Sequence, residues 1–84
     1  MGGRYAIQVA QLRTREEAEA VAARIKQQFG GDLGDRQASI VAISQGGFGT
    51  LHRVTFGPFA DASEWKPICP KLISAKHDCQ PVTQ

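Results

Sequence analysis

The sequence predicts an α+β domain whose strands and helices follow one another in the order βαββαβ. Polar and apolar residues alternate near the N-terminus and in residues 51–56, which predicts half-buried strands. After each of these segments, in residues 14–29 and after residue 60, apolar residues recur at the spacing of a helix. This order is typical of a four-stranded antiparallel sheet with two helices on one face, which leaves the other face open. A length of 84 residues allows one compact domain.

The first strand is predicted in residues 4–12, because polar and apolar side chains alternate there with a period of two. Tyr5, Ile7 and Val9 are expected to face the helices. The opposite, open face of this strand is expected to carry Ala6, Gln8 and Ala10. We expect residues 1–3 to be an added segment or a linker, and residues 4–84 to form the single domain.

The first helix is predicted from about Thr14 to Phe29. Thr14 and Glu17 have the spacing of a capping box, in which each side chain bonds to a free amide of the first turn. Gly30 and Gly31 are expected to end the helix in a left-handed conformation. The apolar stripe along the helix consists of Ala18, Val21, Ala22, Ile25 and Phe29.

The middle of the chain predicts a hairpin. Residues 32–37 are polar and are expected to form a loop, after which residues 39–44 form the second strand with Val41 and Ile43 facing inward. Residues 45–50 are a glycine-rich hairpin loop.

The third strand is predicted in residues 51–56 and is expected to end at Gly57-Pro58, because proline has no amide for the ladder. Its alternation places Val54 and Phe56 inward. The open face then receives Leu51, Arg53 and Thr55.

The second helix is predicted to begin after Asp61, and its prolines, above all Pro70, predict a kink or a late start. A short last strand is expected in residues 78–83, where Pro81 suits a sheet edge. We expect Cys69 and Cys79 to form a disulfide that ties this helix to the last strand, which favours an oxidising compartment. Two buried free thiols are the alternative.

Composition and residue spacing argue against several classes of function. The net charge of +2 is too small to make nucleic acid an expected partner. No apolar run is long enough to span a membrane, and no signal peptide is evident, so no direct membrane contact is expected. A zinc site formed by Cys69, His77 and Cys79 would lack a fourth ligand, so no metal is expected. The sequence shows no arrangement of catalytic residues, so neither a cofactor nor enzyme activity is expected.

The predicted open face combines small and polar residues with one guanidinium, which suits an extended polymer rich in hydroxyl and amide groups. RNA-binding domains of the RNP, ferredoxin-like topology carry aromatic residues on the central strands for base stacking, and this face has none. An RNA-binding domain and a protein-interaction domain that uses the sheet face remain the alternatives.

The first strand with its capped, alanine-rich helix, followed by residues 53–59 (RVTFGPF) and a second helix, resembles the SPOR domain. The resemblance covers nearly the whole chain. Its specific parts are Gln8 and the RVTFGPF segment, whereas Ala10, Leu12 and His52 depart from residues that are common in the family.

The resemblance implies a non-catalytic module of bacterial cell-envelope proteins that binds septal peptidoglycan at cell division. It implies that the open sheet face binds denuded glycan strands, with Gln8 and Arg53 as contacts. Periplasmic localisation at the division septum follows, as part of a larger envelope protein, and we expect a monomer. The expected glycan-binding residues are Ala6, Gln8, Ala10, Leu51, Arg53 and Thr55.

Overall fold

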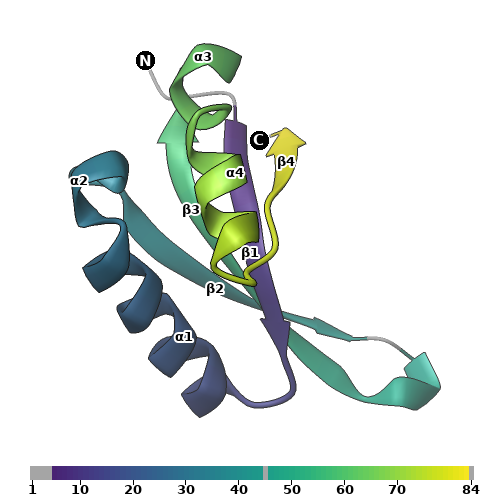
Figure 1. Ribbon diagram of the computed structural model, residues 1–84. Helices are drawn as coiled ribbons and strands as arrows, with labels where there is room; N and C mark the ends of the chain where they lie inside the picture. The colour runs from purple at the N-terminus through teal and green to yellow at the C-terminus, as the bar shows by residue number, and fades with distance from the viewer. Residues whose placement is uncertain (1–4, 45, 84) are drawn as a thin grey trace.

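The computed structural model describes residues 5–44 and 46–83. Its four strands form one antiparallel sheet in the order β2-β3-β1-β4, so the first and third strands are the central pair. The predicted α+β class and four-stranded antiparallel sheet are confirmed, while the expectation for residues 1–3 falls outside the described ranges. The elements are β1 (Tyr5–Leu12), α1 (Arg15–Gln28), α2 (Gly30–Leu33), β2 (Gln37–Ser44), a 3-10 turn (Gly46–Phe48), β3 (Thr50–Phe59), α3 (Ala62–Trp65), α4 (Ile68–Ser74) and β4 (Gln80–Thr83) (Figure 1).

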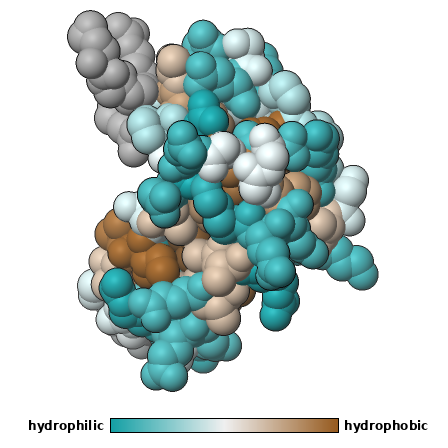
Figure 2. Space-filling model, turned by 90° about the vertical axis from the view of Figure 1, so that its left-hand side faces the viewer, coloured by the Kyte–Doolittle hydropathy of each residue, from teal (hydrophilic) through white to brown (hydrophobic). Residues whose placement is uncertain are grey.

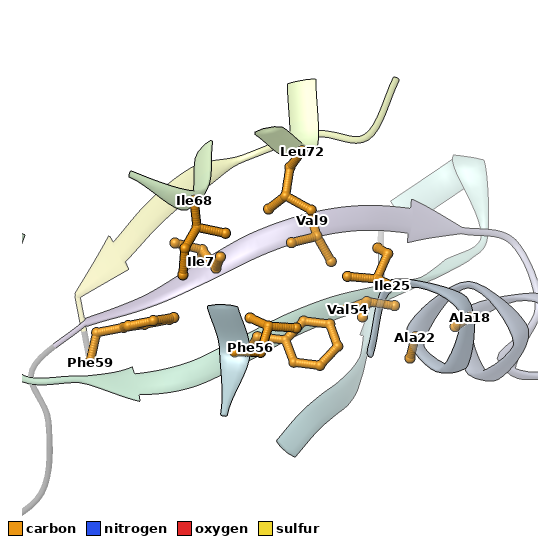
Figure 3. Close-up of a cluster of buried hydrophobic side chains, with 11 residues drawn as sticks. Ile7, Val9, Ala18, Ala22, Ile25, Val54, Phe56, Phe59, Ile68 and Leu72 are labelled. Atoms are coloured by element: carbon orange, nitrogen blue, oxygen red, sulfur yellow. The ribbon is translucent and has the colours of Figure 1, made fainter. Parts of the chain in front are cut away.

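The helices cover one face of the sheet, and the hydrophobic core lies between the two layers (Figure 3). Burial of apolar side chains in this layer is the main driving force for folding. No helix within the described ranges is both long and apolar enough to cross a membrane. The core consists of Ile7, Val9, Ala18, Ala22, Ile25, Leu33, Val54, Phe56, Phe59, Ile68 and Leu72.

Thr14 caps helix α1 as predicted, but Glu17 accepts from the Thr14 hydroxyl and not from the Thr14 amide. The amide of Glu17 donates to Thr14 Oγ1 at 3.1 Å, and the Thr14 hydroxyl donates to Glu17 Oε1 at 3.1 Å. The predicted left-handed exit at Gly30 and Gly31 is wrong, because these residues begin α2 and the positive φ of 62° lies at Gly34. The extra turn exists because it buries Leu33 completely in the core.

The inward direction predicted for Val41 and Ile43 is wrong. β2 pairs with β3 so that Ile40 lies opposite Val54, a core residue, whereas Val41 lies opposite Arg53. Directly opposed residues of antiparallel strands share a face. Ile40 therefore packs against the core, and Val41 and Ile43 point to the open face.

A β-bulge in β1 moves Ala10 to the helix side. Gln8 lies opposite Thr55 and Ala10 lies opposite Val54, so the extra residue Val9 shifts the alternation by one position. Ala10 packs against the core, and the predicted position of Ala10 on the open face is wrong. Gln11, opposite Arg53, takes that place on the open face.

β3 continues through Gly57-Pro58 to Phe59, so the predicted end of this strand is wrong. A second irregularity in the pairing with β1 accommodates the proline, because Ile7 lies opposite Phe56 and Tyr5 lies opposite Phe59. Phe59 is fully buried.

Gly57 is required by the close approach of β1. A Cβ at this position would lie 3.1 Å from the Ala6 Cβ and 3.2 Å from the Tyr5 carbonyl oxygen. Gly57→Ala is therefore expected to lower the free energy of unfolding by about 1 to 2 kcal/mol, the usual cost of overpacking. Urea unfolding measures the loss. The control is Gly31→Ala, whose new methyl meets nothing within 4 Å; equal stability of the two variants contradicts the packing argument.

The second predicted helix is divided in two. Asp61 caps α3 by accepting from the Ser63 amide at 2.9 Å, and Pro67 precedes α4. Pro70 is the third residue of α4, where no helical amide bond is lost. The predicted interruption and the predicted disulfide are confirmed: Cys69 of α4 is bonded to Cys79, one residue before β4, with the two Cα atoms 5.3 Å apart.

Arg36 joins three segments that are distant in sequence. Its guanidinium donates to the Pro58 carbonyl at 2.9 Å, to the Leu33 carbonyl at 3.2 Å and to Glu64 Oε1 at 2.9 Å. Its Cζ also lies 4.2 Å from the centroid of the Phe59 ring. These three acceptors are reached together by the planar, fork-shaped guanidinium of arginine, which the single ammonium group of lysine cannot replace.

Arg36→Ala is expected to lower the free energy of unfolding by about 2 kcal/mol, because it leaves two carbonyls and a carboxylate without this donor and exposes the Phe59 ring. Arg36→Lys restores the charge without the fork and should recover less than half of the loss. Thermal or urea unfolding distinguishes the variants. Full recovery with lysine would show that charge alone matters at this position.

Candidate functional site

The face of the sheet without helices carries one continuous row of polar side chains. Strand pairing places one residue from each of the four strands side by side across the sheet, and we call these residues the polar row. Each is an uncharged hydrogen-bonding residue, and the row crosses three strand spacings, about 14 Å. From β2 to β4, the polar row consists of Ser39, Thr55, Gln8 and Gln80.

A second row runs beside it. Arg53 lies at its centre, between Val41 of β2 and Gln11 of β1. Beyond this row, toward the β2–β3 hairpin, Ile43 lies opposite Leu51. The open face therefore changes from polar amides and hydroxyls at its middle to aliphatic side chains at the hairpin end.

Arg53 lies at the centre of the open face, and one of its donors is unused within the described ranges. The residue is half-buried, and its Nε is sealed from solvent with no hydrogen-bond partner. A buried donor without a partner carries a free-energy penalty, but because this Nε is sealed from solvent, a ligand on the open face reaches it only if the Arg53 side chain moves. Because the flanking residues are Val41 and Gln11, no carboxylate lies directly across from the guanidinium on either neighbouring strand.

Gln8 is less accessible than expected. It retains only 7% exposure, because it lies in the middle of the sheet with strands on both sides. Next to it, the Thr55 hydroxyl donates to the Ser39 carbonyl at 3.5 Å. Gln8 thus forms part of the floor of the open face, whereas Gln11 and Gln80 are exposed.

The structure brings most of the predicted site residues together. Gln8 and Arg53 lie on the same face of neighbouring central strands, as predicted, but they are diagonal neighbours: Gln8 lies opposite Thr55, and Arg53 lies two residues before Thr55 in β3. Thr55, Leu51 and Ala6 share that face, although Ala6 is buried. Ala10 is excluded by the bulge. The sequence interpretation missed further members of the face, which include Gln11, Gln37, Ser39, Val41, Ile43, Gln80 and Val82.

The strand positions of this face carry hydrogen-bonding groups, and Arg53 is the one charged residue among those that the structure describes. Amides, hydroxyls and one guanidinium offer donors and acceptors to a ligand rich in hydroxyl and amide groups. Within the described ranges, no cluster of three or more metal-ligating residues is found. The sulfurs of Cys69 and Cys79 are bonded to each other, so neither is a thiolate that could bind zinc.

Comparisons with known proteins agree with this architecture. The family model of the SPOR domain matches residues 2–83. The solution structure of the peptidoglycan binding domain of the B. subtilis cell wall lytic enzyme CwlC is similar, with a TM-score of 0.67 and 14% sequence identity. The similarity covers 100% of this chain and 92% of that one. No curated protein matches the chain.

Proposed function

Because the chain belongs to the SPOR domain family, we propose that it is a non-catalytic module that binds the glycan strands of peptidoglycan through the open sheet face. The observation that carries the proposal is the polar row together with the neighbouring Arg53, which has no carboxylate directly across from it on either adjacent strand. Sugar hydroxyls and N-acetyl groups accept and donate hydrogen bonds at short intervals along a glycan. A row of about 14 Å is long enough to contact more than one sugar ring.

The binding domain of CwlC supports the same ligand class, since it has this fold and binds peptidoglycan. We further propose that the preferred ligand is a glycan strand without stem peptides, as the resemblance to the family implies. A flat, shallow face formed from strands offers glycan hydroxyls and N-acetyl groups direct contact, whereas a stem peptide projecting toward the sheet would hold the sugars away from Gln8.

The periplasm and the division septum are the proposed location, where the domain would direct a larger envelope protein to sites of division. The disulfide between Cys69 and Cys79 supports this part of the proposal, because disulfides form and persist in oxidising compartments.

Co-sedimentation with purified sacculi tests the function. The chain should pellet with sacculi treated with an amidase that removes stem peptides, and more weakly with untreated sacculi. Binding to both preparations with equal affinity would contradict the preference for denuded strands, and binding to neither would contradict the proposed function.

Salt should have little effect on the binding. Arg53 is the only charged residue at the described strand positions of the open face, so at most about one counterion is released. Raising the salt concentration from 50 to 200 mM should therefore weaken binding to denuded sacculi less than about fourfold. A steep loss of affinity would indicate several ionic contacts and would favour a polyanion such as RNA.

A further inference from the structure

The two edges of the sheet differ in their protection against pairing with another strand. β4 has four residues, one of which is Pro81, so this edge is short and lacks one donor. β2 has eight residues, and its sequence QASIVAIS contains no charged residue, proline or glycine. Its outer side has no neighbouring strand in the described sheet. Long, uncharged edges of this kind readily pair with another strand.

In place of the monomer expected from the sequence, we propose that β2 pairs in the antiparallel direction with β2 of a second copy of this chain, joining two sheets into one. The two-fold axis lies at Val41 and runs perpendicular to the sheet, so the helices of both copies lie on the same side. This register pairs Ser39 with Ile43 and Ile40 with Ala42 of the other copy. In all, seven residues, 38–44, are paired.

The side chains select this register. Opposed residues must share a face, so the axis passes through a residue of β2 and not between two residues. An axis at Val41 places the most exposed aliphatic side chain of the strand, with 50% exposure, against its own copy. An axis at Ile40 pairs equally many residues of β2 but places Val41 against Ser39, and an axis at Ala42 pairs only residues 40–44. β2 carries no charge that would repel its copy.

The shape of the molecule allows this approach. The β2–β3 hairpin extends beyond the helices, so the second half of β2 is free of the helical layer (Figure 1). On the side of the molecule that carries α1 and α2, the surface includes an apolar area among polar residues (Figure 2). Val41 and Ile43 add aliphatic surface to the open face beside this edge.

Self-pairing places two open faces side by side in one sheet. A single strand pair buries less area than a stable dimer needs, so the isolated domain should associate weakly. Several chains bound to one polymer would be at a high effective concentration, and the pairing would then increase avidity. The pairing itself does not depend on the proposed function, because it can be measured without ligand.

Sedimentation velocity over a range of protein concentrations tests the pairing. The chain should change from monomer to dimer at protein concentrations below about 1 mM, which corresponds to a weak but specific association. Val41→Lys places two ammonium groups against each other on the axis and should remain monomeric with an unchanged melting temperature. Thr83→Lys adds the same charge on the opposite edge and should dimerise like the parent. A monomeric parent, a dimeric Val41→Lys or a monomeric Thr83→Lys overturns the proposal.

Cysteine cross-linking tests the register. Residues on the axis are about 4.5 to 5.5 Å apart between Cα atoms, within the range of a disulfide. Val41→Cys should therefore form a covalent dimer under mild oxidation. Ser44→Cys is exposed on the same strand, but its two copies would be about 20 Å apart, and it should remain uncross-linked. Equal cross-linking of both variants contradicts the register.

Discussion

Removing the disulfide between Cys69 and Cys79 is expected to lower the free energy of unfolding by about 3 kcal/mol. The bond closes a loop with a sequence separation of 10, and the loss of this constraint on the unfolded chain accounts for most of the effect. β4 is otherwise attached to the sheet by its pairing with residues 5–8 of β1 and, just before the strand, by the Asp78 amide, which donates to the Val9 carbonyl at 3.1 Å. For a domain whose total stability is on the order of 5 to 10 kcal/mol, the bond is a large part of the whole.

Urea unfolding of Cys69→Ala, Cys79→Ala and the double variant measures this contribution. Either single substitution breaks the bond, so the three variants should lose nearly the same free energy, with a strongly non-additive double variant. A reductant should destabilise the parent by a similar amount and leave the double variant unchanged. A parent whose unfolding midpoint does not respond to reductant would contradict the assigned role of the bond. Alkylation followed by intact-mass measurement verifies that the unreduced chain has no free thiol.

Loss of the polar side chain of Gln8 or of Arg53 is expected to weaken glycan binding by about tenfold to a hundredfold. This range corresponds to about 1 to 3 kcal/mol for a hydrogen bond to a polar or charged group. Arg53→Ala should hardly change the melting temperature, because the Nε of Arg53 has no protein partner to lose. Gln8 is nearly buried, so Gln8→Met is preferable to alanine: it keeps the volume of the side chain and removes only the amide.

The matched controls lie on the helical side of the molecule. Arg24→Ala and Gln27→Met make the same chemical changes at exposed positions of α1, away from the open face, and should bind denuded sacculi as the parent does. Parent-like binding by both Arg53→Ala and Gln8→Met would exclude the open face as the glycan site. An equal loss of affinity in the α1 controls would show that the effect does not depend on the open face.

Much of the face could be predicted because β1 and β3 alternate clearly up to the bulge. The alternation therefore assigned Gln8, Arg53 and Thr55 to the correct face of the sheet. The alternation fails at Ala10, since nothing local distinguishes a bulge at Val9 from a regular strand. A bulge depends on the partner strand, and the pairing is not visible from β1 alone.

The sequence of β2 alone also could not predict which of its side chains face the core. Ile40, Val41 and Ile43 are all aliphatic, so periodicity does not show which of them face the core. The register with β3 decides this by placing Ile40 opposite Val54. Arg36 was missed because its partners Pro58 and Glu64 lie 22 and 28 residues away in sequence, and in isolation it reads as a polar loop residue.

The most direct test of the central claim is an NMR titration with a soluble denuded glycan, observed through side-chain signals that belong to one face. The account predicts shifts of the Gln8 and Gln11 side-chain amides and of Arg53 Nε–H, while the Val21 methyls on α1 stay unchanged. A glycan fragment that retains its stem peptides should give smaller shifts at the same positions. Shifts centred on the helices, with the Gln8 and Arg53 signals unmoved at saturation, would contradict binding through the open sheet face.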